Sequence, residues 1–286
     1  MKIGFIGLGI MGESMSKRII DLHDDKVFVY DLVNEKVKKL VEEGGFAAES
    51  NKDLASKSDV IISMVPRSEH TKALFEDIKD ELCEGKIWID MSTISPEVSR
   101  EVAKDVKKLG AEFADAPVVK SKPAAISGEL GIYVGSTNEL FEKIKSILSY
   151  MGSNIIHMGD NGNGLVMKIC HNALVSQIQN GVNETIKLAG SNGIAIDEFV
   201  KAISYGGGQN FYLDSKNQAI KNKDYKTAFS IENMNKDLNL CLELAQQKNI
   251  DLPGVKNAKN VYSKAMEAGF GKDDFSKTYE IVEGNK

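Results

Sequence analysis

The chain is poor in cysteine, has no excess of positive charge and contains no long apolar run, and each of these absences excludes a class of protein. Its three cysteines, Cys83, Cys170 and Cys241, are odd in number and far apart, which matches neither a disulfide framework nor a zinc-binding spacing. The formal net charge of -5 offers no basic surface for nucleic acid. We therefore expect reduced thiols, with Cys170 as a small buried side chain, no bound metal and no nucleic-acid partner.

Signals for membranes and for export are also missing. No apolar stretch approaches the roughly 18 residues that a membrane-spanning helix requires. The first residues, "MKIGFIGLG", read as a strand followed by glycines and lack the charged and apolar regions of a signal peptide. We therefore expect a cytoplasmic protein without a membrane partner.

The length and the hydrophobic pattern predict the fold class. A chain of 286 residues exceeds the usual domain size of roughly 100 to 150, which predicts two domains. Short β-branched and aromatic runs alternate in the first half with amphipathic stretches such as "EKVKKLVEEGG", which ends on glycine as helices do. The predicted strands are 2–6, 26–30, 59–65, 86–90, 111–115 and 130–135. This alternation predicts an α/β fold with a doubly wound parallel sheet.

The pattern changes near residue 162. From Gly164 to about Ala189, apolar residues recur at helical spacing and no proline interrupts them, which predicts one long helix. Later stretches, such as "ENMNKDLNLCLELAQQKN", are helical in period as well. We predict an N-terminal domain over 1–162 and an all-α C-terminal domain over 163–286, with a long interdomain helix over about 163–190.

The stretch "GFIGLGIMGES" places three glycines between the first strand and the first helix. In a dinucleotide site Gly7 permits the tight turn, Gly9 lets backbone amides approach a pyrophosphate and Gly12 allows close packing. Asp31 ends the second strand, where a carboxylate accepts hydrogen bonds from the adenosine ribose and repels a 2'-phosphate. A tight turn that serves packing alone and an Asp31 that caps the next helix are the alternatives. The residues predicted to bind NAD here, in preference to NADP, are Gly7, Leu8, Gly9, Ile10, Met11, Gly12 and Asp31.

Two later loops also follow predicted strands, where ligands of an open parallel sheet bind. Val65 and Pro66 follow the third strand, and His70 comes a few residues later, although a loop histidine is more often a surface residue. Ser92 and Thr93 follow the fourth strand in "DMSTISPE", where their hydroxyls could reach the nicotinamide, just ahead of Ser95, which we expect to cap a helix. We predict that Val65, Pro66, His70 and Thr93 border the cofactor.

Four motifs, taken in order and spacing, resemble the β-hydroxyacid dehydrogenase family, whose members include 3-hydroxyisobutyrate dehydrogenases. They are "GFIGLGIMGESM", "DMSTISP", "DAPV" with "SGELGIYVG", and "GNGLVMKICHNALV", and the resemblance covers nearly the whole chain. It implies a Rossmann domain that binds NAD, a long connecting helix, a helical domain and a homodimer or homotetramer. The implied reaction is reversible hydride transfer between NAD(P) and the hydroxyl carbon of a short 3-hydroxy acid.

The resemblance also implies site residues. The family's catalytic lysine lies in a Gly-x-x-x-Lys-x-x-x-Asn pattern, which here is Gly164, Lys168 and Asn172. Steps of four residues put all three on one helix face, where we expect Asn172 and Gly164 to contact the substrate. A solvated side chain is the alternative for Lys168, but its neighbours are mostly apolar. In "NMNKDLNL", Lys236 corresponds to a family lysine near the nicotinamide or the substrate. We expect Asp237 to have a different partner, because adjacent residues do not share a helix face.

One motif departs from the family. Most members follow "DAPV" with Ser-Gly-Gly, which holds the substrate carboxylate, whereas this chain has Val119, Lys120 and Ser121. A basic residue followed by a hydroxyl looks more like the 3-sulfolactaldehyde reductase branch and suits a small anionic substrate. Lys120 in solvent is the alternative. 3-Hydroxyisobutyrate, succinic semialdehyde and tartronate semialdehyde stay open as substrates.

Two further classes are alternatives to this enzyme. A dinucleotide-binding module without catalysis would lack the lysine and carry basic segments, whereas Lys168 and Asn172 are present here. An imine reductase of the related branch generally replaces the catalytic lysine. The residues therefore favour an NAD-dependent oxidoreductase acting on CH-OH groups.

Overall fold

The computed structural model describes residues 1–282. The chain divides into two compact units, of which the first is Met1–Lys168 and the second starts at Ile169. We refer to them as the first and the second unit and describe each by itself.

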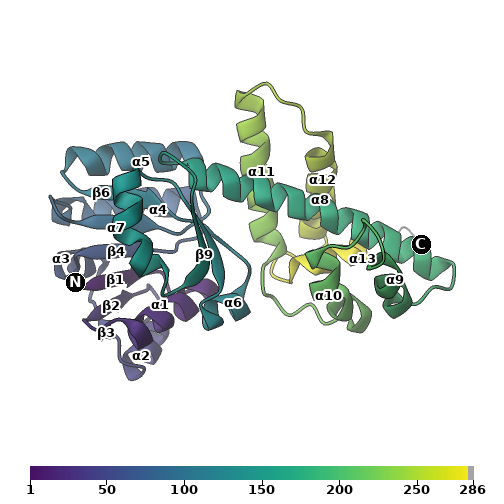
Figure 1. Ribbon diagram of the computed structural model, residues 1–286, viewed down its shortest axis with the longest axis horizontal. Helices are drawn as coiled ribbons and strands as arrows, with labels where there is room; N and C mark the ends of the chain where they lie inside the picture. Colours follow the sequence, from purple (N-terminus) through teal and green to yellow (C-terminus); the bar gives the residue numbers. More distant parts are fainter. Residues whose placement is uncertain (283–286) are drawn as a thin grey trace. The chain divides into compact units, whose positions relative to one another are not determined.

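A six-stranded parallel sheet forms the centre of the first unit (Figure 1). The sequence predicts a parallel sheet and five of these strands, but not β3. Its spatial order is β3-β2-β1-β4-β5-β6, and every neighbouring pair is parallel. The strand order reverses between β1 and β4, and such a switch point opens a crevice beyond the carboxyl ends of the strands. The strands are β1 (Ile3–Ile6), β2 (Val27–Tyr30), β3 (Phe46–Ala47), β4 (Val60–Ser63), β5 (Ile87–Asp90) and β6 (Glu112–Asp115).

Helices cover both faces of this sheet because its central strands are apolar on both sides. In β4 and β5 alternate residues enter two separate cores: Ile62 and Ile89 belong to one, Ile61 and Trp88 to the other. α1 (Ile10–Leu22) and α2 (Asn34–Glu42) pack into the first core, which extends further to segments that follow β6. The second is completed by α3 (Asn51–Lys57), α4 (Ser68–Ile78) and α5 (Pro96–Lys108), with the short η1 (Lys79–Glu81) after α4.

A second, three-stranded sheet corrects one prediction. The strand predicted at 130–135 is not part of the doubly wound sheet, because β8 (Leu130–Val134) pairs with β7 (Val118–Val119) antiparallel and with β9 (Gly152–His157) parallel. Neither β7 nor β9 was predicted: the first has two residues, and half of the residues of the second are exposed. Two helices connect these strands, α6 (Lys122–Ser127) and α7 (Asn138–Leu148).

The second unit is helical. α8 runs from Asn163 to Ser191, where the sequence predicts a long helix, so it begins in the first unit and continues in the second. The other helices are α9 (Ile196–Ile203), α10 (Phe211–Asn222), α11 (Ile231–Gln247), α12 (Pro253–Glu267), η2 (Phe275–Thr278) and α13 (Tyr279–Val282). Ile169, Met234, Leu238 and Tyr262 form the centre of one core of this unit. No helix within residues 1–282 is long and apolar enough to cross a membrane.

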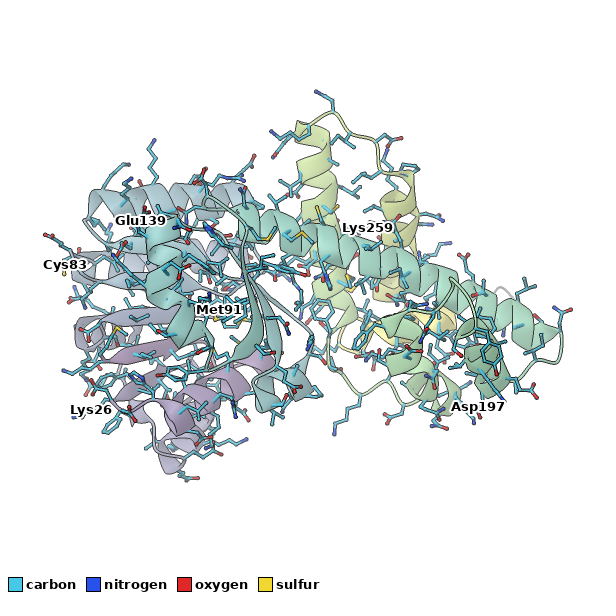
Figure 2. All side chains as sticks on the ribbon, in the orientation of Figure 1. Lys26, Cys83, Met91, Glu139, Asp197 and Lys259 are labelled. Atoms are coloured by element: carbon cyan, nitrogen blue, oxygen red, sulfur yellow. The ribbon has the colours of Figure 1, made fainter. Side chains whose placement is uncertain are left out.

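The cysteines are free thiols, as expected, but one lies where it was not expected. Cys83 is exposed on the first unit (Figure 2). Cys170 is exposed, so the prediction of a buried thiol is wrong: it lies on the exposed face of α8 together with Leu174. Cys241 is buried, and burial raises the pKa of its thiol to about 11.

Candidate active site

The glycine loop between β1 and α1 has the geometry of an anion cradle. Gly7 adopts a φ of 92°, and a Cβ on it would overlap the carbonyl of Met64. A Cβ on Gly12 would overlap the carbonyl of Gly7, so only glycine lets α1 pack against the loop. Gly9, by contrast, faces open space and precedes the first turn of α1 without a side-chain cap. The amides at this helix start are therefore available to a phosphate.

Asp31 fastens this loop to the end of β2. Its Oδ2 accepts a hydrogen bond from the Leu8 amide (2.7 Å), and its Oδ1 accepts one from the Val33 amide (2.9 Å). It is not the cap of the next helix, because α2 begins at Asn34 with Val33 as its N-cap. Lys36 Nζ lies 3.4 Å from the carboxylate oxygens, a basic partner that the sequence analysis missed. The spacing of five residues from Asp31 was the available signal.

The loops after β4 and β5 are joined through a buried carboxylate. Asp90 accepts hydrogen bonds from the hydroxyls of Ser92 (2.5 Å), Ser63 (2.9 Å) and Thr71 (3.2 Å), and burial raises its pKa. Because the Ser92 hydroxyl donates to Asp90, its oxygen is left to accept the Val65 amide at 2.8 Å. This chain of hydrogen bonds connects the two loops that were predicted to border the cofactor.

The predicted residues of these loops differ in exposure. Val65 and Thr93 are partly buried, whereas Pro66 and His70 are exposed, His70 in the first turn of α4. Ser95 is the N-cap residue of α5, but its side chain makes no capping hydrogen bond. The surface alternative for His70 therefore matches its exposure, and its role as a cofactor contact stays a prediction.

The predicted substrate loop lies between β7 and α6. Val119 is buried in β7, Ser121 is the partly buried N-cap residue of α6, and Lys120 between them is exposed. Lys120 has a φ of 75°, a left-handed conformation that costs a side chain about 1 kcal/mol and that glycine adopts freely. The strained backbone falls where the family pattern has its first glycine. The loop thus keeps a glycine-type turn while presenting an ammonium.

The predicted catalytic face belongs to α8. Lys168 is 7% exposed and Asn172 is 4% exposed, so the lysine is buried rather than solvated. Asn172 Nδ2 donates a hydrogen bond of 2.6 Å to Oδ2 of Asp237, which is 1% exposed. Gly164 is buried too, and a Cβ on it would lie only 2.9 Å from the Asp115 carboxylate. The structure thus gives Gly164 a packing reason, while its contact with substrate stays a prediction.

Lys236 and Asp237 correct another prediction. They were expected to have different partners, but Lys236 Nζ lies 3.1 Å from Asp237 Oδ1. Adjacent Cβ atoms diverge on a helix, yet the four-carbon stem of a lysine is long enough to return to its neighbour's carboxylate. Lys236 keeps 21% of its side chain exposed, so the cofactor contact predicted for it is sterically open and stays a prediction.

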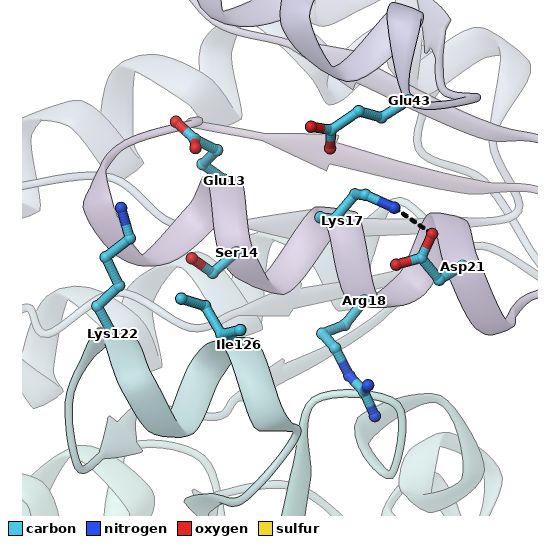
Figure 3. A pocket seen from close by; sticks show the side chains of 8 residues that line it. All are labelled: Glu13, Ser14, Lys17, Arg18, Asp21, Glu43, Lys122 and Ile126. Carbon is cyan, nitrogen blue, oxygen red and sulfur yellow. Dashed lines mark hydrogen bonds and ion pairs between the residues drawn. The ribbon is translucent and has the colours of Figure 1, made fainter.

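A surface hollow of about 400 Å³ lies beside α1 (Figure 3), but it contains none of the predicted site residues. Two of its charged residues form ion pairs, Lys17 with Asp21 and Glu13 with Lys39. The lining residues are Glu13, Ser14, Lys17, Arg18, Asp21, Glu43, Lys122 and Ile126. Within the described part of the chain, no cluster of three or more His, Cys, Asp or Glu side chains has the geometry of a metal site.

Two family matches cover almost the whole chain. Residues 2–159 match the NAD binding domain of 6-phosphogluconate dehydrogenase. Residues 162–282 match the family described as NAD-binding of NADP-dependent 3-hydroxyisobutyrate dehydrogenase.

Individual proteins align over similar lengths. The chain is 30% identical to 2-(hydroxymethyl)glutarate dehydrogenase of Eubacterium barkeri, over 99% of this chain and 95% of that protein. It is also 30% identical to glyoxylate/succinic semialdehyde reductase 1 of Arabidopsis thaliana, over 99% and 98%. Among solved structures, the 3-hydroxyisobutyrate dehydrogenase of Mycobacterium tuberculosis with L-serine has a TM-score of 0.90 and 26% identity, over 99% of both chains.

Proposed function

This chain belongs to the β-hydroxyacid dehydrogenase family, and from that premise we propose that it transfers a hydride between NAD(H) and a small aldehyde or alcohol that carries an acid group. The coarser part of this statement follows from the family: the chain is a dinucleotide-dependent oxidoreductase. The proposed reaction at a substrate carbonyl or hydroxyl is supported by the burial of Lys168 one turn from Asn172 on α8. A charged side chain is buried at considerable cost, and catalysis supplies a reason for that cost.

The glycine loop fits the proposed cofactor. The open side of Gly9 and the first amides of α1 would hold the pyrophosphate, and Asp31 would accept hydrogen bonds from the adenosine ribose. Bound NAD supplies the two-electron hydride acceptor, and NADH supplies the donor. The loops that Asp90 and Ser92 tie together would border the nicotinamide, with Val65, Pro66, His70 and Thr93 facing it.

Lys168 moves the proton in this proposal. In oxidation the hydroxyl oxygen of the substrate would lose its proton to a neutral Lys168 Nζ, while hydride leaves the carbon that bears this hydroxyl and a C=O bond forms. In reduction the Lys168 ammonium stabilises the developing alkoxide and returns a proton to it. Asn172 orients the substrate, and its amide is held in place by the Asp237 carboxylate. Lys236, which partly offsets the Asp237 charge, is proposed to lie near the nicotinamide.

NAD is the proposed cofactor because Asp31 places a carboxylate where NADP carries a phosphate. The Lys36 ammonium weakens that repulsion, so we expect a preference for NAD and not a complete rejection of NADP. The preference rests on Asp31 and is tested by changing it.

The loop between β7 and α6 is proposed to bind a small anionic group of the substrate. Lys120 supplies an exposed positive charge and Ser121 a hydroxyl without a capping bond, while Val119 forms the buried base of the loop. A point charge beside a donor suits a sulfonate, as in 3-sulfolactaldehyde, or a carboxylate, as in the semialdehydes of succinate, methylmalonate and tartronate.

A homodimer or homotetramer is proposed from the surface of α8. Leu174 and Leu188 are exposed large apolar side chains of α8, and they lie on one helix face with the exposed Cys170 and Gly181. The same face also carries the polar residues Gln177 and Glu184. Light scattering of the purified protein should give a multiple of the 31.3 kDa chain mass. A single-chain mass at micromolar concentration would contradict the proposal, and Leu174→Lys should lower the mass of an assembly built on this face.

The activity is tested by following NADH oxidation over four aldehydes: 3-sulfolactaldehyde, succinic semialdehyde, methylmalonate semialdehyde and tartronate semialdehyde. Lys168→Ala should lower turnover of the accepted substrate by at least ~100-fold while NADH still binds. Lys187→Ala, which changes another lysine of α8, is the matched control and should stay active. NADH binding without turnover of any aldehyde would favour the binding module instead.

A further inference from the structure

The buried carboxylate of Asp115, at the end of β6, contacts the start of α8. It is fully buried, and its two oxygens accept hydrogen bonds from different amides of the helix start. Oδ1 accepts from the Gly162 amide at 2.6 Å, and Oδ2 accepts from the Leu165 amide at 3.1 Å. The two partners lie 47 and 50 residues further along the chain.

These two amides are the ones that a capping box satisfies. α8 starts at Asn163, so Gly162 is its N-cap residue and Leu165 its third residue. The first amides of a helix lack partners within the helix, and a polar N-cap side chain normally binds one of them. Gly162 has no side chain to do so. Asp115 takes this part from a strand of the sheet.

Glycines make room for the carboxylate. A Cβ on Gly135 would lie 2.6 Å from both Asp115 oxygens, and a Cβ on Gly164 would lie 2.9 Å from Oδ2. A Cβ on Gly164 would also overlap the carbonyl of Tyr133. Side chains at these positions would force the carboxylate away from the amides, so the cap depends on both glycines.

The turn before α8 is held to the sheet from its other side as well. Asn161 Nδ2 donates to the carbonyls of Phe113 (2.9 Å) and Gly135 (3.1 Å). Arg100 Nε donates to the Asn161 carbonyl at 3.1 Å. The backbones of Asp115 and Gly135 also exchange two hydrogen bonds, of 3.1 and 2.8 Å. The start of α8 therefore has one arrangement relative to β6 and β8.

We propose that Asp115 is a positioning residue, which caps α8 from the sheet and thereby sets the direction of the Lys168 side chain. Lys168 follows Leu165 by three residues, less than one helical turn, so the cap and the lysine belong to the same rigid segment. The inference rests on the catalytic role proposed for Lys168. A reacting group misplaced by about 1 Å can lose on the order of 100-fold in rate.

Asp115→Asn is the informative change because it keeps the shape and removes one acceptor. An amide side chain offers one oxygen, and its NH₂ group would face the N–H of either Gly162 or Leu165. Asp160→Asn is the matched control: it removes the same charge from an exposed residue of the same turn. Three quantities are compared: kcat with NADH and the aldehyde that the screen selects, the Kd of NADH, and amide exchange over 158–168.

For Asp115→Asn we expect kcat to fall at least ~10-fold, exchange over 158–168 to accelerate and the Kd of NADH to stay within about twofold. Asp160→Asn should leave all three unchanged. Wild-type kcat in Asp115→Asn despite faster exchange would overturn the positioning role, as would a loss of NADH affinity as large as the loss of kcat. If Asp115→Asn does not fold, Asn161→Ala replaces it, because it frees the same turn. Asn161→Ala should then lower kcat and accelerate exchange over 158–168 while the Kd of NADH stays unchanged.

Lys168→Ala separates this inference from the proposed function. An active Lys168→Ala enzyme would overturn the role of the lysine itself. An inactive Lys168→Ala enzyme beside a fully active Asp115→Asn enzyme would overturn the positioning role alone.

Discussion

The stability of the first unit should depend on pH through Asp115. Burial raises the pKa of this carboxyl from its ordinary 3.8 to about 6, although hydrogen bonds from the Gly162, Leu165 and Asp115 amides lower it, and the charge of Asp90 adds to the rise. A folded-state pKa above the unfolded value means that the folded chain binds more protons between about pH 4 and pH 6. The contribution of Asp115 is thus present in full below about pH 4 and is lost as pH rises through about 6.

The size of this effect follows from the shift. A shift of about 2.2 pKa units corresponds to about 3 kcal/mol, of which about 2 kcal/mol is lost between pH 4.5 and pH 8. Ionised Asp115 therefore costs stability at neutral pH. A buried carboxylate that costs stability and yet binds the first amides of α8 fits the positioning role proposed above.

Urea unfolding measures the pH dependence of the unfolding free energy of the first unit. Trp88 is the single tryptophan of the chain, is fully buried and lies in the same unit as Asp115, so its fluorescence reports the unfolding of that unit. The difference in unfolding free energy between wild type and Asp115→Asn should change by about 2 kcal/mol from pH 4.5 to pH 8. Asp90, whose pKa is also raised, titrates in both proteins. A difference that does not vary with pH would refute the reasoning.

Three other changes test the rest of the site. Asp31→Ser should shift the ratio of kcat/KM for NADH over NADPH toward NADPH by roughly 10-fold, about 1.4 kcal/mol, and an unchanged ratio removes the ribose argument. Gly12→Ala should abolish NADH binding in calorimetry, because its Cβ would displace the Gly7 carbonyl; wild-type affinity would show that the loop yields. A double-mutant cycle of Asn172→Ala and Asp237→Ala, monitored by unfolding of the second unit, should give a coupling of about 1 to 3 kcal/mol, whereas additive effects would mean that their 2.6 Å hydrogen bond contributes little.

Much of the first unit could be predicted because its signals are local. Apolar runs bounded by polar segments locate five of the six strands of the parallel sheet. The spacing of the glycines in the β1–α1 loop indicates a turn in which a side chain at Gly7 or Gly12 would overlap the backbone. The two-residue strands β3 and β7 and the half-exposed strand β9 have no such signal. Without β7 and β9, β8 was assigned to the wrong sheet, since pairing partners are chosen by contacts and not by the strand's own residues.

The site shows the same division. The spacing of Gly164, Lys168 and Asn172 is a property of the sequence, because helical geometry places residues four apart on one face. The sequence by itself therefore determined the face of α8 that carries the lysine. Its glycine order and its apolar period likewise determined the β1–α1 loop and the long helix. The apolar neighbours of Lys168 already favoured its burial, which the structure confirms. That Lys236 turns back to Asp237, and that Asp115 caps α8 across 47 residues, were decided by the tertiary structure alone. Burial and hydrogen-bond partners depend on which segments meet in space, and for residues this far apart no local pattern encodes that meeting.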